Sequence, residues 1–128
     1  MKSIFLKVCL IFFFASAGLI YAQVHYIFLN EDEANLVESG SFSIVVSEGD
    51  SIIFVSKNGE FQIRIREAYE ILDVTVDDLS FNVTSTSSSP AYVVRSGIDD
   101  SITKEYLVFS IGTLEWPDAP PRIIIRVY

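Results

Sequence analysis

Few side chains in this sequence could carry chemistry, and they are scattered. His25 is the only histidine, and Cys9 is the only cysteine. A nucleophilic triad needs a hydroxyl or thiol beside a base and an orienting group, and a transition-metal site needs several nitrogen or sulfur ligands. No second histidine accompanies His25, the only cysteine lies 16 positions before it, and no Gly-x-Ser-x-Gly motif is present. We therefore interpret His25 as an ordinary surface residue of a first strand. We expect no catalytic residues, no metal site, no cofactor and no enzyme activity.

Acidic side chains gather in three short clusters, Glu31-Asp32-Glu33, Asp77-Asp78 and Asp99-Asp100. Calcium takes six to eight oxygen ligands, roughly, and loop carboxylates at one end of a β-sandwich can supply them. The spacing matches no EF-hand, and a glycosidase pair would need a deep cleft that a domain of this size rarely has. Solvated loop tips and a calcium site both stay open as interpretations of these clusters.

The only tryptophan, Trp116, lies in a stretch that contains three prolines, residues 116–121. Prolines exclude a helix or an interior strand there, so we predict a stiff loop over 113–121. Glu115 and Asp118 flank the indole, and an aromatic ring with carboxylates on a rigid loop could contact a sugar or a protein. Trp116, Glu115 and Asp118 are therefore the candidate ligand-binding residues. In the competing interpretation the indole folds inward and closes one end of the core.

The elements that must position this loop are strands. Residues 42–47 and 61–66 alternate apolar and polar side chains with a period of two, which is typical of half-buried strands. Residues 51–56 are apolar on both faces, which favours a more central strand. Asn58-Gly59 between the second and third runs predicts a two-residue hairpin turn with positive φ at both positions. We thus expect three consecutive strands at 41–47, 51–57 and 60–66.

The rest of the chain is also rich in strand signals. Further strands are expected at 24–29, 92–95, 106–111 and 123–128, with one or two short ones within 74–83. Residues 67–73 favour a turn or two of helix. The prediction is an all-β fold, a single antiparallel β-sandwich of about seven or eight strands with at most one short helix.

The first residues predict export. Lys2 and Lys7 precede fifteen uncharged residues, 8–22, fewer than the roughly 20 that span a bilayer. We predict a signal peptide at 1–22, cleaved after Ala22, and one domain at 23–128 that is secreted or periplasmic and keeps no transmembrane segment. Cleavage near Ala17, or an uncleaved anchor continuing to residue 29, are the alternatives.

Cleavage after Ala22 would change the chemistry of the remaining chain. The only cysteine and the only methionine leave with the leader, so the mature chain has no disulfide and no sulfur ligand. Its 17 acidic residues outnumber seven basic ones, a net charge of −10. This charge repels phosphate backbones, so nucleic acid is not an expected partner.

Residues 41–55, SFSIVVSEGDSIIFV, resemble the strand–Gly-Asp–strand opening of cupredoxins, and the layout of 106–110 and 122–128 resembles their last two strands. The resemblance implies a cupredoxin-like sandwich, although an immunoglobulin-like one also fits the strand pattern. A blue-copper site needs a thiolate, two imidazoles and usually a thioether. Ser110 stands where a cupredoxin would place its cysteine, and loop 112–121 has no histidine or methionine. The resemblance therefore implies a copper-free relative.

Taken together, the sequence predicts an exported, non-catalytic interaction domain whose partner is an unknown protein or carbohydrate. The alternative is a structural subunit that assembles by pairing an exposed edge strand, for which the apolar end of the chain, 122–128, is the candidate. A calcium- or carbohydrate-binding module is a third possibility. Asn82-Val83-Thr84 fits the N-glycosylation pattern and falls in a possible strand.

Overall fold

The structure is a computed structural model that describes residues 21–127. The predicted signal peptide therefore lies outside the described residues except for its last two positions, Tyr21 and Ala22. Within the described range the chain forms nine strands and one single turn of 3-10 helix, η1 (Ala68–Glu70). The strands are β1 (Val24–Asn30), β2 (Ser43–Val46), β3 (Ser51–Asn58), β4 (Phe61–Ile65), β5 (Leu79–Val83), β6 (Tyr92–Val93), β7 (Ile102–Glu105), β8 (Leu107–Ser110) and β9 (Arg122–Ile125).

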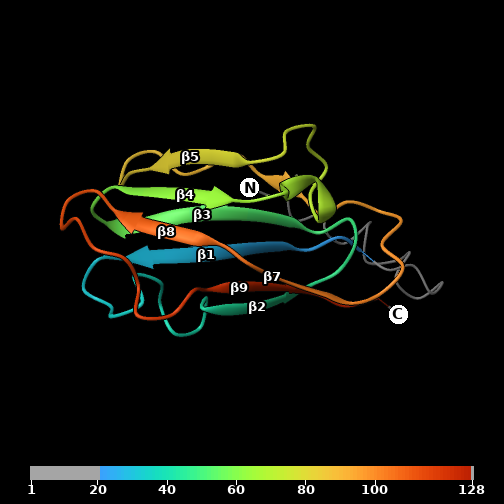
Figure 1. Cartoon of the computed structure of the whole chain (residues 1–128), viewed down its shortest axis with the longest axis horizontal. Coiled ribbons are helices and arrows are strands. Elements are labelled where there is room, and N and C mark those ends of the chain that lie inside the picture. The colour runs from blue at the N-terminus through green and yellow to red at the C-terminus, as the bar shows by residue number, and fades with distance from the viewer. Residues whose placement is uncertain (1–20, 128) are drawn as a thin grey trace, which may run out of the picture.

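The strands form two layers, which confirms the predicted all-β sandwich. One layer has the order β1-β3-β6. The other combines β5-β4-β8 with β2-β9-β7, because β7 and β8 are separated only by Tyr106 and form one nearly continuous stretch of chain. Figure 1 shows the succession β5, β4, β8, β9, β2 from top to bottom.

The pairing is mixed rather than purely antiparallel. β1 runs parallel to β3 and β2 runs parallel to β9, while the other four strand pairs are antiparallel. The parallel pair β1–β3 arises because β2, the strand between them in sequence, belongs to the opposite layer. A chain that crosses to the other layer and returns re-enters the first layer in its original direction.

The same crossing corrects the predicted hairpin at Asn58-Gly59. The strands on either side of it, β3 and β4, lie in different layers and do not pair. Only Gly59 has a positive φ, 80°, and the Asn58 side chain instead accepts a hydrogen bond from the Glu31 backbone N–H at 2.9 Å. The turn is therefore an arch between the layers, which Asn-Gly can form as readily as a hairpin turn.

The predicted edge strand at the chain end is also wrong. β9 lies between β2 and β7 and is hydrogen-bonded on both sides, and the strand ends at Ile125. An apolar strand near the end of a chain is typical of an interior position as well as of an edge, since it buries the same side chains. Within the described residues the outer strands of the three hydrogen-bonded sheets are β1 and β6, β2 and β7, and β5 and β8.

The core lies between the layers and is filled by alternate residues of the strands. β4 buries Phe61, Ile63 and Ile65 and exposes Gln62 and Arg64, as its period of two predicts. Two edge-to-face aromatic contacts centre on Phe54 of β3, whose ring centroid is 5.6 Å from that of Tyr106 and 5.2 Å from that of Phe81. Such pairs add to the burial of apolar area as a source of stability.

Replacing Gly59 by valine should destabilise the domain by about 1–3 kcal/mol, because a β-branched residue is strained at positive φ. A Cβ there would also collide with the Glu31 carboxylate, so the side chain that covers the arch would have to move. Denaturant unfolding measures the effect. Gly40→Val is the matched control, since a Cβ at Gly40 meets open space and φ there is ordinary. Equal midpoints for the two variants would contradict the assigned arch.

Candidate functional site

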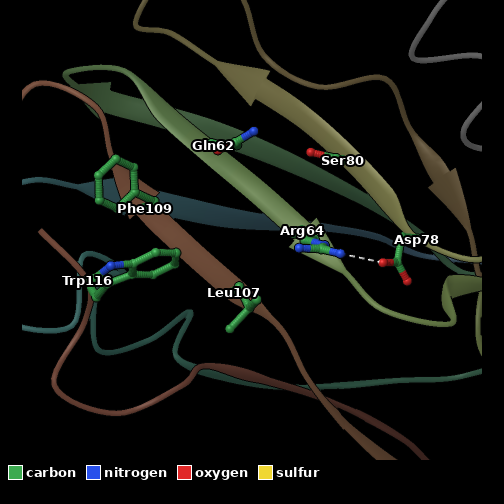
Figure 2. A pocket seen from close by; sticks show the side chains of 7 residues that line it. All are labelled: Gln62, Arg64, Asp78, Ser80, Leu107, Phe109 and Trp116. Carbon is green, nitrogen blue, oxygen red and sulfur yellow. Dashed lines mark hydrogen bonds and ion pairs between the residues drawn. The ribbon is translucent and has the colours of Figure 1, made fainter. Parts of the chain in front are cut away.

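A shallow groove of about 310 Å³ lies on the outer face of the β5-β4-β8 sheet. Its lining comes from three strands, the segment before β5 and the loop after β8. The lining residues are Gln62, Arg64, Asp78, Ser80, Leu107, Phe109 and Trp116. Figure 2 shows the two aromatic rings at one end of the groove and the Arg64–Asp78 pair at the other.

The strand register explains this distribution of side chains. Gln62 on β4 lies directly opposite Phe109 on β8, and Arg64 lies opposite Leu107 on one side and Ser80 of β5 on the other. Because side chains alternate between the faces of a strand, these residues share the face that points away from the core. The outer face is therefore polar on β4 and β5 and apolar on β8.

The aromatic end of the groove consists of Phe109 and Trp116. Their ring centroids are 4.8 Å apart and the ring planes are inclined at 51°. Trp116 is 60% exposed, so the indole does not close the end of the core. The sequence left two alternatives for Trp116, an exposed indole and an indole that closes the end of the core. The structure shows the exposed one. An amphipathic ring that is exposed beside a groove can contact a ligand without first leaving the core.

The loop that carries Trp116 is fixed at both ends. The Ser110 N–H donates to the Glu115 carbonyl at 2.9 Å, and the Ala119 N–H donates to the Asn35 side chain at 3.0 Å. Pro117, Pro120 and Pro121 restrict the backbone between and beyond these bonds. The indole is thus presented by a backbone that has little conformational entropy left to lose on binding.

The polar end of the groove is an ion pair. Arg64 Nη2 donates to Asp78 Oδ2 at 2.6 Å, and the two side chains are 49% and 41% exposed. This hydrogen bond from Arg64 holds the pKa of Asp78 below its usual range, outweighing the opposing effect of desolvation. Asp78 therefore stays ionised at neutral pH, and the pair can both donate to and accept from a ligand.

Two smaller hollows continue the groove around Leu107. One, of about 270 Å³, shares Arg64 and Leu107 with it and adds Arg66, Glu105 and Pro120. The other, of about 240 Å³, shares Leu107 and Trp116 with it and adds Pro117. The lining is therefore continuous along β8, which suits an extended ligand better than a compact one.

The three residues predicted as ligand-binding do not form one site. Trp116 lines the groove, whereas Glu115 and Asp118 are exposed on the same loop and line none of the three hollows. The sequence analysis missed Arg64, Gln62 and Phe109. A signal for the first two was present, because the alternation that buries Phe61, Ile63 and Ile65 turns Gln62 and Arg64 outward. Gln62 and Arg64 lie in the same groove as Trp116 because β4 pairs with β8.

His25 is not the surface residue that the sequence suggested. Its Nε2 lies 2.8 Å from Oδ2 of Asp50, and the histidine side chain is only 21% exposed. A carboxylate can only accept, so Nε2 carries the proton in this contact. The two residues meet because the turn before β3 lies beside the start of β1, which the parallel β1–β3 register brings about.

The acidic clusters do not converge. In residues 21–127 no three His, Cys, Asp or Glu side chains lie close enough together to hold a metal ion. Asp78 is engaged by Arg64, and Asp32 accepts a hydrogen bond from Asn58 Nδ2 at 3.1 Å. Asn82 is exposed on β5, opposite Gln62.

The chain matches no protein-family profile and no curated protein sequence. Its fold is similar to that of amicyanin, a cupredoxin, in a reduced Cu(I) form. The TM-score is 0.49 at 10% sequence identity, and the match covers 86% of this chain and 89% of that chain. The predicted weak resemblance to cupredoxins, based on residues 41–55 and on the layout of 106–110 and 122–128, has this counterpart among solved structures. The assignment of an all-β sandwich rests on the strands themselves.

The emission of Trp116 should be red-shifted and readily quenched by acrylamide in the folded protein, because the indole is mostly in water. Trp116→Ala should cost about 1 kcal/mol, the order of its contact with Phe109. Phe54→Ala, which empties part of the core, should cost about 3–5 kcal/mol and is the matched control. Equal losses of stability, or a blue-shifted and protected spectrum, would show that the indole is buried.

Proposed function

We propose that this protein is an exported, non-catalytic binding domain whose groove beside Trp116 binds a carbohydrate chain. The observation that carries the proposal is the arrangement of an aromatic pair, the exposed Trp116 and the half-buried Phe109, facing an ion pair across one groove. A sugar ring has an apolar face of C–H groups and a rim of hydroxyl groups. The groove offers a matching surface for each.

The polar lining suits hydroxyl groups in particular. Arg64 and Asp78 present donors and acceptors side by side, and Gln62 and Ser80 add further groups of both kinds. The lining has one cation and one anion, so a neutral ligand meets no net charge there. Anionic polymers are disfavoured by the acidic surface of the rest of the chain.

The chemistry of the groove supports binding rather than catalysis. Of the residues that line the groove itself only Asp78 is a carboxylate, and the Arg64 hydrogen bond keeps it ionised, while Glu105 lines the adjoining hollow. A general acid has to be protonated, and glycoside hydrolysis uses two carboxyl groups. Ser80 has no histidine among the other lining residues to activate it.

Binding should be measured by titrating soluble cello-, chito- and manno-oligosaccharides into the protein and following the emission of Trp116. We expect at least one series to bind, with longer chains binding more tightly because the groove continues past Leu107. Trp116→Ala should weaken binding by about fivefold or more, since stacking contacts of this kind contribute about 1 kcal/mol or more.

Leu114→Ala is the matched control for this titration. Leu114 is on the same loop and 73% exposed but lines none of the hollows, so its loss should leave affinity unchanged. Equal affinity of wild type and Trp116→Ala for every series would refute the assigned groove.

Export is the other half of the proposal, and it is supported by the charged and apolar pattern of residues 2–22. No helix in the described part of the chain is long and apolar enough to cross a membrane. We predict that protein recovered from outside the cytoplasm begins at Gln23, which intact-mass measurement decides. A full-length species held in the membrane would contradict cleavage.

A structural role by self-association is the second candidate, and one feature of the other layer favours it. Val24 and Tyr26 on the edge strand β1 are 53% and 50% exposed, and Tyr26 lies beside Ile53 of β3. This outer face is apolar. Within residues 21–127, the Glu38–Ser41 segment bonds to the edge of β1 only at Tyr26 and Phe28. Sedimentation velocity separates the two candidates, because a subunit of this kind would form oligomers that Tyr26→Lys disrupts.

A further inference from the structure

A buried carboxylate lies at the position where the mature chain would begin. The Gln23 backbone N–H donates to Asp50 Oδ1 at 2.9 Å, and the Gln23 carbonyl accepts from the Ser51 N–H at 2.8 Å. The first residue after the predicted cleavage point is therefore held on both of its backbone groups. Asp50 is only 6% exposed.

Asp50 collects donors from separate parts of the fold. Its Oδ2 accepts from His25 Nε2 at 2.8 Å and from the Ser47 N–H at 3.0 Å, while Gln23 alone bonds to Oδ1 in the described chain. Burial raises the pKa of Asp50, but the hydrogen bonds from Gln23, His25 and Ser47 outweigh it and the net shift is downward. The carboxylate is thus ionised and faces the backbone nitrogen of Gln23.

Cleavage after Ala22 changes that nitrogen from an amide N–H into a primary amine, which is a cation when protonated. We propose that Asp50 is the binding site for the α-ammonium group that signal-peptide cleavage creates on Gln23. The neutral hydrogen bond then becomes a charge-assisted one in a partly buried setting, which is the stronger kind. This inference rests on the proposed export and is independent of the groove and its ligand.

The first consequence is a raised pKa of the amine. An opposite charge in contact favours the protonated form, so the amine should titrate above its ordinary range of about 7.7–8.0. The titratable group that contacts this nitrogen is Asp50, which His25 contacts in turn, and Glu48 in the same turn accepts from the Ile98 N–H. Because the pKa is higher in the folded state, the added stability is complete below about pH 7.7 and is lost as the pH rises through the folded pKa.

The second consequence concerns the side chain of Gln23. An N-terminal glutamine cyclises when its neutral amine attacks its own side-chain carboxamide: a bond forms from the amine nitrogen to Cδ, and ammonia leaves. A protonated amine has no free electron pair for this attack. The bound α-ammonium should therefore keep Gln23 in its open form.

The test compares two chains that differ by one residue, one beginning at Gln23 and the other at Ala22. The pKa of each α-amine is measured from the pH dependence of its acylation rate, with the same chains unfolded in urea as references. We expect a pKa at least one unit higher for folded Gln23-start protein than for its unfolded form, and no such difference for Ala22-start protein. Ammonia loss, followed by intact mass near pH 6.5, below both pKa values, should be about tenfold slower in folded than in unfolded Gln23-start protein, the factor for one pKa unit.

Asp50→Asn in the Gln23-start chain should abolish both the pKa shift and the protection from ammonia loss. Ser47→Ala is its control, because Ser47 contacts Asp50 through the backbone and keeps that bond. Since Asp50→Asn can lose its fold, the wild-type comparison decides alone. The proposal fails if the two wild-type amines titrate alike, and also if the exported protein begins elsewhere than at Gln23.

Discussion

The second layer of the sandwich depends on one stretch of chain, residues 102–110, which changes its partner at Tyr106. Before this residue β7 pairs with β9, and after it β8 pairs with β4. The Tyr106 ring is buried against Phe54 of the other layer, and its N–H donates to the Pro121 carbonyl at 3.1 Å. Tyr106 thus joins two short three-stranded sheets and ties them to the opposite layer. Because residues 21–127 contain no cysteine, such packing has to provide their stability.

The change of strand pairing at Tyr106 also determines where the candidate site lies. Since β8 pairs with β4 only after Tyr106, Leu107 and Phe109 come to lie on the outer face beside Arg64 and Gln62. The loop that follows folds back along β8, where its bond from Ser110 to Glu115 sets Trp116 over Phe109. The groove is therefore built on rigid elements, and its one exposed aromatic comes from a loop that is fixed at both ends. Function on such a frame can vary by loop and outer-face substitutions that leave the core intact.

Asp50 couples the start of the described chain to the crossing between layers. It lies in the turn from β2 to β3, holds Gln23 before β1, and its backbone carbonyl accepts from Val94 after β6 at 2.7 Å. All three strands of the β1-β3-β6 layer thus meet near one carboxylate, at the end of the layer where β1 begins. The outward-facing groove and this buried carboxylate lie on different layers.

The sequence by itself determined the class of the fold, most strands and the exposed face of β4, because burial of alternate residues is a local property with a period of two. It also determined that 113–121 is a stiff loop, since proline restricts its own backbone. It could not determine which strands pair. Asn58-Gly59 is compatible with a hairpin and with an arch, and the terminal strand 122–125 buries the same residues in an interior or an edge position. Only the tertiary structure decided that β4 meets β8, that Arg64 and Asp78 face Trp116, and that His25 meets Asp50. Each of these contacts joins residues far apart in sequence, and the free energy of such a contact depends on the whole packing rather than on local preference.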